Sequence, residues 1–277
     1  MNAPFFFVLG VPKSGTTWVQ KALDSHPQLL CRGEGKFMTF RKELSKAALK
    51  YSDALIRHNE KIFGEEVFPP LLRPEFDRIY RGFIEQRLIG DDPPPGVRRI
   101  GNKDPEHGMV LREMAKLFPD AAYIHVIRDP RDVAVSTWHH MRRTEPGFVE
   151  TIGDFAAFAV QNVKEWTVYV RSVRKVVAES GLDYIELRYE DLHADGATIL
   201  QGVFDRLGVE ASATVAANAL EAASFERGSG GRPRGQPDAG SFYRKGEVGD
   251  WRNHMSPQAA DDLLQLTEEL AAGLGYR

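Results

Sequence analysis

The start of the chain constrains its fold more than any other feature. An apolar run at Phe5–Leu9 leads into the segment GVPKSGTTW at residues 10–18. An apolar strand that enters a glycine-rich turn, with a helix opening directly behind it, is the layout of a phosphate-binding loop. Backbone N–H groups at the helix N-terminus point at an anion in such a loop, and Lys13 adds a positive charge. Further donors are the hydroxyl groups of Ser14, Thr16 and Thr17.

The position of the lysine separates this loop from the usual nucleotide loop. Gly10 and Gly15 have the spacing of the Walker form, which requires a lysine directly after the second glycine, but Thr16 stands there. The cation lies before that glycine instead, at Lys13. Such a loop can hold a phosphate group but lacks the usual apparatus for Mg-bound β- and γ-phosphates. A P-loop kinase acting on a small molecule is therefore an alternative with less support.

Apolar strand-like segments alternate with helix-like segments along the 277 residues. Strands are predicted at 5–9, 99–102, 122–127 and 184–187, and helices at 16–25, 43–57, 75–88, 105–118, from about 131, 152–177, 196–207, 213–222 and 257–274. Loops are predicted at 91–96 and, as a basic ligand-closing lid, at 228–235. This alternation predicts an α/β fold in which a central parallel sheet is flanked by helices, in a single domain over residues 1–277.

Composition excludes several classes of protein. A net charge of −3 provides no basic field, so nucleic acid is not an expected partner. The single cysteine, Cys31, excludes an intramolecular disulfide and a cysteine-based metal site, and it indicates a reducing, cytoplasmic location. The apolar run at 5–9 is too short to span a bilayer, so no membrane partner is expected. The oligomeric state stays open, with a homodimer among the alternatives.

A second anion site is predicted after the strand at 122–127. Arg128 stands at the carboxyl end of this strand, where open α/β sheets bind ligands, and Ser136 lies eight residues further on. A guanidinium fork and a hydroxyl suit a second phosphate, while a salt bridge to a nearby carboxylate is the alternative for Arg128. Asp129 and Asp132 are expected to cap the following helix or to pair with Arg131.

A third segment, YRKGEVGDWRN at residues 243–253, combines two adjacent cations with two glycines and a tryptophan. This composition is typical of a flexible basic loop that closes on a ligand, although an ordinary surface turn has the same composition.

Together, and in this order, the three segments resemble the sulfotransferases that use 3′-phosphoadenosine 5′-phosphosulfate (PAPS). Residues 12–18 are similar to that family's 5′-phosphosulfate loop, residues 128–136 to its 3′-phosphate element, and residues 244–253 to its C-terminal signature. The resemblance implies a P-loop NTPase-like sulfotransferase fold, PAPS as co-substrate without a metal, and adenosine 3′,5′-bisphosphate (PAP) as product. It also implies transfer of a sulfuryl group to a hydroxyl of a small-molecule or saccharide acceptor. A non-catalytic nucleotide-binding module is a further alternative.

The resemblance also implies roles for individual residues. The 5′-phosphosulfate would be held by Lys13, Ser14, Gly15, Thr16 and Thr17. The 3′-phosphate would be held by Arg128, Ser136, Arg244, Lys245 and Gly246. Around the adenine, Trp18 would stack on the ring, Tyr189 would meet its edge, and Ser224 with Phe225 would close the other side. For the three aromatic residues, plain core packing is the alternative.

Catalysis requires a cation at the leaving oxygen and a base at the acceptor hydroxyl. Lys13 suits the first task. The cytosolic branch of the family has a histidine after a Lys-Thr pair, but residues 101–107 read GNKDPEH, so that histidine is missing from its usual place. A carbohydrate-directed branch uses a glutamate in a setting similar to EGKF at 34–37, which makes Glu34 the expected base, with Lys103 positioning the acceptor or the sulfuryl group. His107 is the second candidate base, and an ion pair with Arg32 or Lys36 is the alternative for Glu34.

Overall fold

The computed structural model describes residues 5–91 and 94–277. By its internal contacts the chain divides into two compact units. The main unit comprises Met1–Gly33 and Gly96–Arg277, and the second unit comprises Glu34–Pro95. A single domain over residues 1–277 stays a prediction from the sequence.

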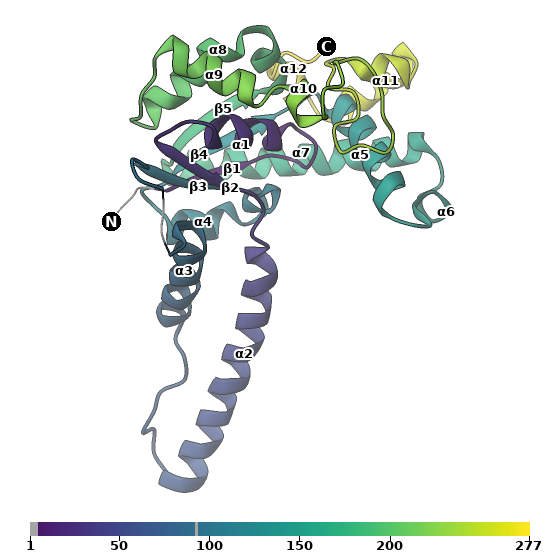
Figure 1. The fold of residues 1–277 in the computed structure, drawn as a ribbon. Helices are drawn as coiled ribbons and strands as arrows, with labels where there is room; N and C mark the ends of the chain where they lie inside the picture. Colours follow the sequence, from purple (N-terminus) through teal and green to yellow (C-terminus); the bar gives the residue numbers. More distant parts are fainter. Residues whose placement is uncertain (1–4, 92–93) are drawn as a thin grey trace. The chain divides into compact units, whose positions relative to one another are not determined.

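A five-stranded sheet forms the centre of the main unit (Figure 1). Its strands are β1 (Phe5–Leu9), β2 (Leu29–Arg32), β3 (Arg99–Lys103), β4 (Ala122–Ile127) and β5 (Asp183–Arg188). They lie in the order β2-β3-β1-β4-β5, and every neighbouring pair is parallel. The predicted α/β fold with a central parallel sheet is therefore confirmed, and four of its strands were expected. Strand β2, which is only four residues long, is not predicted from the sequence.

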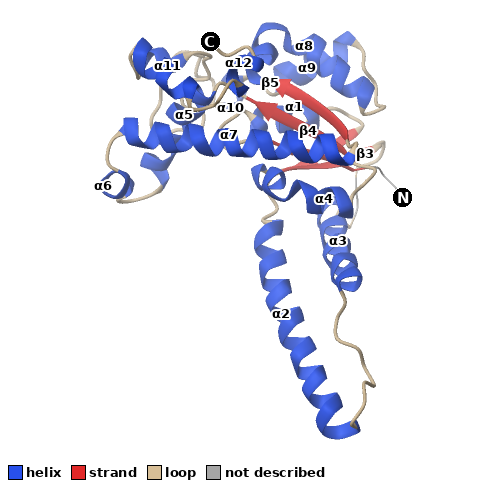
Figure 2. Ribbon diagram, turned by 180° about the vertical axis from the view of Figure 1, so that it is seen from behind, coloured by secondary structure: helices blue, strands red, loops and turns tan. Residues whose placement is uncertain are grey.

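Helices cover both faces of this sheet, as Figure 2 shows from behind. Successive residues of a strand point to opposite faces. On one side, Phe6 and Val8 of β1 pack in a core with residues of α1 (Thr16–Asp24), α8 (Tyr189–Arg206) and α9 (Ala213–Ala222). On the other side, Phe7 packs against Phe118 and Tyr123, with ring centroids 5.0 Å and 5.7 Å away.

Further helices of the main unit complete these layers. They are α4 (Leu111–Leu117), α5 (Pro130–Thr144), α6 (Phe148–Ile152), α7 (Phe155–Ser180), α10 (Phe225–Gly228), α11 (Pro257–Gln265) and α12 (Leu270–Gly273). Two short 3-10 helices occupy Pro105–Val110 and Asp250–Asn253.

Four predicted helices need correction. The predicted helix at 105–118 is a 3-10 turn followed by α4, and the one at 196–207 begins earlier, at Tyr189, with a kink at Asp195. The predicted final helix at 257–274 is two helices, because Glu268 and Glu269 have φ angles of 47° and 68° and so leave the helical conformation. The helix predicted at 152–177 begins only at Phe155, after Gly153 with φ 89° ends α6.

The second unit contains α2 (Phe37–His58), a π-helical turn (Asn59–Phe63) and α3 (Arg73–Ile89). The two long helices were expected, with shorter bounds. The Tyr80 hydroxyl donates to the Phe37 carbonyl over 3.1 Å, and the rings of Phe40 and Phe83 stack 3.7 Å apart. Of the loop predicted at 91–96, residues 92 and 93 lie outside the described residues. In the part of the chain that the structure describes, no helix is both long and apolar enough to cross a bilayer.

The register of the sheet brings the candidate site residues to one edge. Val8 pairs with Lys103, and Leu9 pairs with His125, so β1, β3 and β4 end side by side. Because the strands are parallel, the segments that follow them all leave the sheet at its carboxyl edge.

Candidate active site

The phosphate loop, residues Gly10–Gly15, leaves β1 and opens α1. Its shape requires glycine at both ends. Gly15 is the N-cap of α1 at φ 97°, and a Cβ on it would lie 2.4 Å from Cδ2 of Tyr189. Gly10 has φ 154°, and a Cβ there would lie 2.4 Å from the carbonyl oxygen of Val126. Lys13 adopts φ 73°, a conformation that non-glycine residues seldom adopt and that is often found at functional sites.

Buried polar atoms without hydrogen-bond partners gather around this loop. Within the described residues, no partner is found for Ser14 Oγ, Trp18 Nε1 or Arg128 Nε. Ser14 is completely buried, and Arg128 is 8% exposed. Buried polar groups are nearly always hydrogen-bonded in native proteins. A polar ligand at this edge of the sheet would provide the partners that these donors lack.

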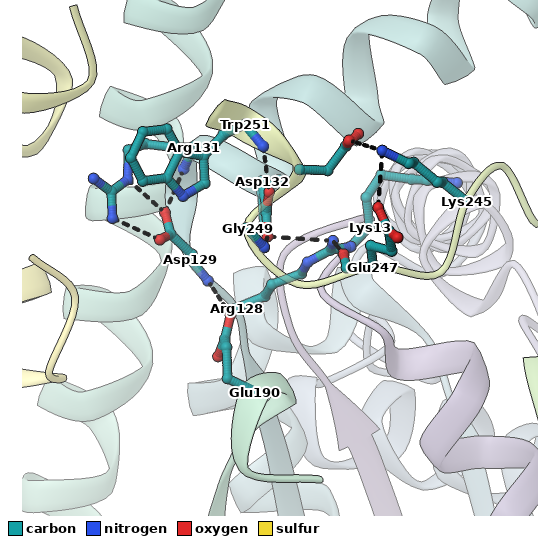
Figure 3. A network of polar contacts seen from close by, with 12 residues as sticks. Lys13, Arg128, Asp129, Arg131, Asp132, Glu190, Lys245, Glu247, Gly249 and Trp251 are labelled. Carbon is teal, nitrogen blue, oxygen red and sulfur yellow. Dashed lines mark hydrogen bonds and ion pairs between the residues drawn. The ribbon is translucent and has the colours of Figure 1, made fainter. Parts of the chain in front are cut away.

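Arg128 connects the phosphate loop to the C-terminal loop, which we define as residues 229–249. One of its guanidinium nitrogens donates to the carbonyl of Glu247 over 2.9 Å, and the other donates to the carbonyl of Lys13 over 3.4 Å (Figure 3). The guanidinium also lies 4.3 Å from the ring centroid of Tyr189 and 3.5 Å from a carboxylate oxygen of Asp132. Arg128 and the phosphate loop thus meet on the same edge of the sheet.

The two aspartates after Arg128 have different tasks. Asp129 behaves as expected, since it caps α5 by accepting from the Arg131 amide and pairs with the Arg131 guanidinium at 2.7 Å. The expectation for Asp132 was wrong. This buried carboxylate accepts from the backbone N–H groups of Gly249 over 2.7 Å and Trp251 over 2.9 Å, because the chain after the C-terminal loop packs onto the first turn of α5.

The two predicted cations of the C-terminal loop are paired within the protein. Both Arg244 and Lys245 bind Asp250, the lysine over 2.6 Å, and Lys245 also lies 2.8 Å from Glu247. Burial raises the pKa of Asp250, but hydrogen bonds from Lys245 and Arg244 outweigh it and hold that pKa well below its usual range. Gly246, at φ 71°, has no room for a side chain, since a Cβ would lie 2.4 Å from Phe225.

One small pocket is lined by residues that were predicted for both phosphate sites. Lys13, Ser136 and Arg244 line it together, so three chain segments far apart in the sequence meet there. The Lys13 ammonium lies 4.2 Å from the ring centroid of Phe242, which belongs to the same pocket. The remaining lining residues are His139, His140, Arg143, Ala239 and Ser241. Among the described residues, no group of three or more His, Cys, Asp or Glu side chains is arranged to hold a metal ion.

Comparison with known proteins identifies the family of the chain. A model described as "Sulfotransferase family" matches residues 4–213. The chain belongs to the sulfotransferase family. It is 24% identical to cytosolic sulfotransferase 17 of Arabidopsis thaliana over 98% of this chain and 75% of that protein. It is 30% identical to protein-tyrosine sulfotransferase 1 of Rattus norvegicus over 47% of this chain, and that match spans only 32% of the rat protein.

Solved structures confirm the sulfotransferase fold. A mouse sulfotransferase complexed with PAP superposes with a TM-score of 0.60 at 19% identity, covering 98% of this chain and 86% of that one. The sulfotransferase domain of the Synechococcus PCC 7002 olefin synthase superposes with a TM-score of 0.53 at 21% identity, covering 99% and 95%. The family and the fold that the sequence motifs predict are therefore confirmed.

In this sulfotransferase the predicted adenine residues form two groups. Trp18 and Tyr189 meet edge to face with centroids 5.5 Å apart, and His193 joins them at 4.8 Å and 4.6 Å. Phe225 packs against Tyr243, 6.1 Å away, while Ser224 caps α10. Lys21 of α1 lies over the Tyr243 ring at 4.9 Å, so the second group also borders the helix that carries Trp18.

The candidate catalytic residues differ in environment. Lys103 ends β3 and is 5% exposed. His107 is 2% exposed, its Nε2 lies 2.6 Å from Oδ1 of Asn102, and burial together with Lys103 lowers its pKa to about 3. An imidazole so hard to protonate is a weak general base. Glu34 opens the second unit and lies 3.7 Å from the Lys36 ammonium, and this ion pair is the alternative role expected for Glu34.

One contributor to the site gave no signal in the sequence. The Tyr169 hydroxyl accepts from the backbone N–H of Gly10 over 3.1 Å and donates to the carbonyl of Pro105 over 2.7 Å. It therefore fixes the start of the phosphate loop from α7. Within an amphipathic helix a tyrosine looks like any core residue, so only the fold identifies it. Asp250, by contrast, stands inside the C-terminal segment that resembles the family, but the resemblance implies no role for it.

Proposed function

We propose that the protein transfers a sulfuryl group from PAPS to a hydroxyl of a small-molecule or saccharide acceptor. The observation that carries the proposal is the set of buried, unpartnered donors at the carboxyl edge of the sheet, beside Arg128 and Lys13. Relatives of the same fold support it, because the mouse sulfotransferase was crystallised with PAP and a retinol dehydratase with retinol and PAP.

The donor has two anionic ends, and the chain offers a cationic group for each. At the 5′ end, the amides of the phosphate loop and the Lys13 ammonium would hold the phosphosulfate, assisted by Ser14, whose hydroxyl lacks a partner. At the 3′ end, Arg128 and Ser136 would hold the phosphate, with Arg244, Lys245 and Gly246 closing over it. Thr16 stands at the position where the Walker loop has its lysine, and a donor without a triphosphate does not require that lysine.

In the transfer step, the acceptor oxygen forms a bond to sulfur while the bond between sulfur and the bridging oxygen breaks. The electron pair of the broken bond stays on the 5′-phosphate of PAP, and the acceptor proton passes to a base. Lys13 would stabilise the charge that develops on the leaving phosphate. Glu34 would accept the proton, and Lys103 would position the sulfuryl group or the acceptor. The low pKa of His107 supports Glu34 over His107.

Calorimetry and a transfer assay test this function. We expect the wild-type protein to bind PAP in the presence of a chelator, and to consume PAPS with a mixed panel of phenols, alcohols and sugars. A protein that binds no PAP contradicts the proposal, and turnover of ATP with magnesium supports the kinase alternative. PAP binding without transfer to any hydroxyl supports the binding-module alternative.

Two substitutions separate binding from chemistry. Glu34→Gln and Lys13→Met should each lower kcat by about a hundredfold or more, because they remove the base and the leaving-group cation. PAP affinity should survive Glu34→Gln. Matched controls are Glu43→Gln and Lys46→Met, which alter an exposed ion pair on α2 and should leave kcat unchanged. Equal losses in PAP affinity and in kcat for Glu34→Gln would contradict its role as base.

A further inference from the structure

Helix α7, which lies along one face of the sheet (Figure 2), contacts the segments that follow three different strands, and one turn of the helix makes all of these contacts. Trp166 donates from its indole Nε1 to the carbonyl of Arg128, which follows β4, over 3.1 Å. The Tyr169 hydroxyl binds the amide of Gly10, which follows β1, and the carbonyl of Pro105, which follows β3. Residues three apart in a helix share one face and lie about 4.5 Å apart along its axis. One face of α7 therefore holds the backbone at both predicted phosphate sites.

The backbone of Arg128 is fixed from two sides. Its carbonyl accepts from Trp166, and the amide of the same peptide unit, that of Asp129, donates to a carboxylate oxygen of Glu190 over 2.9 Å. Trp166 is completely buried, in an apolar cluster that includes Val11 of the phosphate loop. Side chains in such close-packed clusters have little room to move. The residue that carries the guanidinium is therefore placed relative to the phosphate loop before a ligand binds.

The Tyr169 hydroxyl is confined and fully used. A Cβ added at Gly108 would lie 2.0 Å from its oxygen, so a larger residue at this position must displace it. The oxygen accepts from Gly10 over 3.1 Å, and the hydroxyl proton is donated to Pro105 over 2.7 Å. Lys103, which is expected to position the sulfuryl group or the acceptor, lies two residues before Pro105. The hydroxyl therefore links the phosphate loop to the end of β3.

We propose that Trp166 and Tyr169 are positioning residues that set the separation of the two phosphate sites, and that they thereby select a nucleotide whose phosphates have this separation. The inference rests on the proposed sulfotransferase function and deepens it, because it adds a specificity among adenosine bisphosphates. Each residue acts through a backbone group instead of touching the donor. Trp166 acts through Arg128 at the 3′ end, and Tyr169 acts through the phosphate loop at the 5′ end.

Three nucleotides measure the two ends separately by calorimetry. AMP carries only the 5′-phosphate, PAP carries both phosphates, and adenosine 2′,5′-bisphosphate carries the second phosphate on the neighbouring oxygen. The ratio of PAP to AMP affinity measures the contribution of the 3′-phosphate, and the ratio of PAP to isomer affinity measures how strictly the separation is enforced. In the wild-type protein we expect each ratio to be about tenfold or more, because AMP and the isomer lose charge-assisted hydrogen bonds at the 3′ site.

Removal of the indole donor should affect the 3′ end alone. Trp166→Phe leaves the carbonyl of Arg128 without its partner on α7, so PAP affinity should fall by about threefold to tenfold while AMP affinity stays unchanged. Both affinity ratios should therefore decrease. Because the loss of a buried tryptophan can also unfold the chain, a second variant carries 3-benzothienylalanine at position 166. This residue has the size of tryptophan but lacks the N–H, and it should give the same decrease.

Removal of the tyrosine hydroxyl should affect the 5′ end. Tyr169→Phe should lower the affinities for AMP and PAP by the same factor, about threefold to tenfold, and leave their ratio unchanged. Gly108→Ala is a second variant, because its methyl group displaces the same hydroxyl without deleting it, and it should give the same pattern. Tyr123→Phe is the matched control. The Tyr123 hydroxyl is also buried and donates to a backbone carbonyl, that of Phe118, but it lies near the amino end of β4, so all three affinities should stay unchanged.

Several outcomes would overturn the inference. It is wrong if the wild type binds both bisphosphates equally, or if the two variants at position 166 keep both ratios at their wild-type values. It is also wrong if Tyr169→Phe changes no affinity, or only as much as Tyr123→Phe does, because the hydroxyl would then support the fold and not the site. A wild-type protein that binds neither PAP nor AMP overturns the proposed function itself, whereas a protein that binds PAP and sulfates a hydroxyl, with unaltered ratios in the variants, overturns only this inference.

Discussion

The phosphate loop and the C-terminal loop both carry predicted donor-binding groups, but they hold them in opposite states. In and beside the phosphate loop, Ser14 Oγ and Arg128 Nε are buried without partners among the described residues. In the C-terminal loop, Arg244 and Lys245 are already bound to Asp250. The donors in and beside the phosphate loop therefore lack partners among the described residues, whereas the cations of the C-terminal loop are neutralised by the carboxylate of Asp250.

This difference follows from how each region is positioned. The phosphate loop is fixed between β1 and α1, and Tyr169 holds its first amide, so its donors are oriented before any ligand arrives. The C-terminal loop has no regular structure of its own and is attached through backbone contacts to Asp132 and Arg128. A phosphate bound there must either share Arg244 and Lys245 with Asp250 or replace Asp250 as their partner. We therefore expect the phosphate loop to determine affinity, and the C-terminal loop to respond to the ligand.

The largest expected effect comes from adding a side chain at Gly15 of the phosphate loop. Gly15→Ala places a methyl group 2.4 Å from the Tyr189 ring at φ 97°, so either the ring or the start of α1 must move. We expect PAP affinity to fall by about tenfold or more, together with about 1–3 kcal/mol of stability. Calorimetry and urea denaturation measure the two quantities.

Gly202→Ala is the control for this substitution. Gly202 lies inside α8 with no neighbouring atom within 4 Å of an added Cβ, so alanine should raise stability by about 0.5–1 kcal/mol and leave PAP binding unchanged. Unchanged PAP affinity in Gly15→Ala would show that a rigid phosphate loop does not determine the affinity for PAP.

A smaller effect is expected from removing the carboxylate of the C-terminal loop. Asp250→Asn leaves Arg244 and Lys245 without their shared anion, so the ligand-free protein should lose about 1–3 kcal/mol of stability. PAP would then replace the missing charge. We expect the rise in melting temperature on adding PAP to be greater in the variant than in the wild type.

The exposed acid Asp261, on α11, provides the control, since Asp261→Asn should change neither melting temperature. A smaller PAP-induced shift in Asp250→Asn than in the wild type would mean that Asp250 holds the loop in its binding form instead of competing with the ligand.

The sequence predicted the position of the phosphate loop and Arg128 better than the contacts of the C-terminal loop. Strand ends and helix starts obey local rules, so the positions of Gly10, Lys13, Gly15 and Arg128 followed from apolar runs and glycine spacing, and the segments themselves were recognised as a family pattern. The parallel sheet followed from the same alternation. The expectation that Asp129 caps the helix or pairs with Arg131 is confirmed, because Asp129 does both.

Contacts between distant segments could not be predicted in this way. Asp132 binds amides more than a hundred residues away, and the Tyr169 hydroxyl reaches the phosphate loop from another helix. Both residues have the local pattern of ordinary helix positions. The break at Glu268 and Glu269 also could not be predicted, because glutamate is a good helix former, whereas both residues have a positive φ in the structure. The short β2 carried too few residues for a period to be visible.

The last expected effect is the dependence of stability on pH. His107, behind the phosphate loop, is neutral in the folded protein because burial lowers its pKa to about 3, against an ordinary value of 6.5. Below pH 6.5 the unfolded chain binds a proton that the folded protein does not, so the free energy of unfolding falls as pH decreases. The slope that one such group adds approaches about 1.4 kcal/mol per pH unit. Buried His125, whose pKa is also lowered to about 3, contributes in the same direction.

Asp250 acts in a different window. Its pKa is held below the ordinary 3.8, so its stabilising contribution is complete above that value and is lost only as the pH falls further. Between pH 6.5 and 5, urea denaturation of the wild type should therefore report on the histidines whose pKa burial lowers, which include His139 and His193 with pKa values of about 4. His107→Gln should reduce the slope there, whereas Asp250→Asn should lower stability by a constant amount, and His58→Gln, at an exposed position, should leave the slope unchanged. An unaltered slope in His107→Gln would mean that this histidine is protonated alike in the folded and unfolded chains, which its burial against Asn102 opposes.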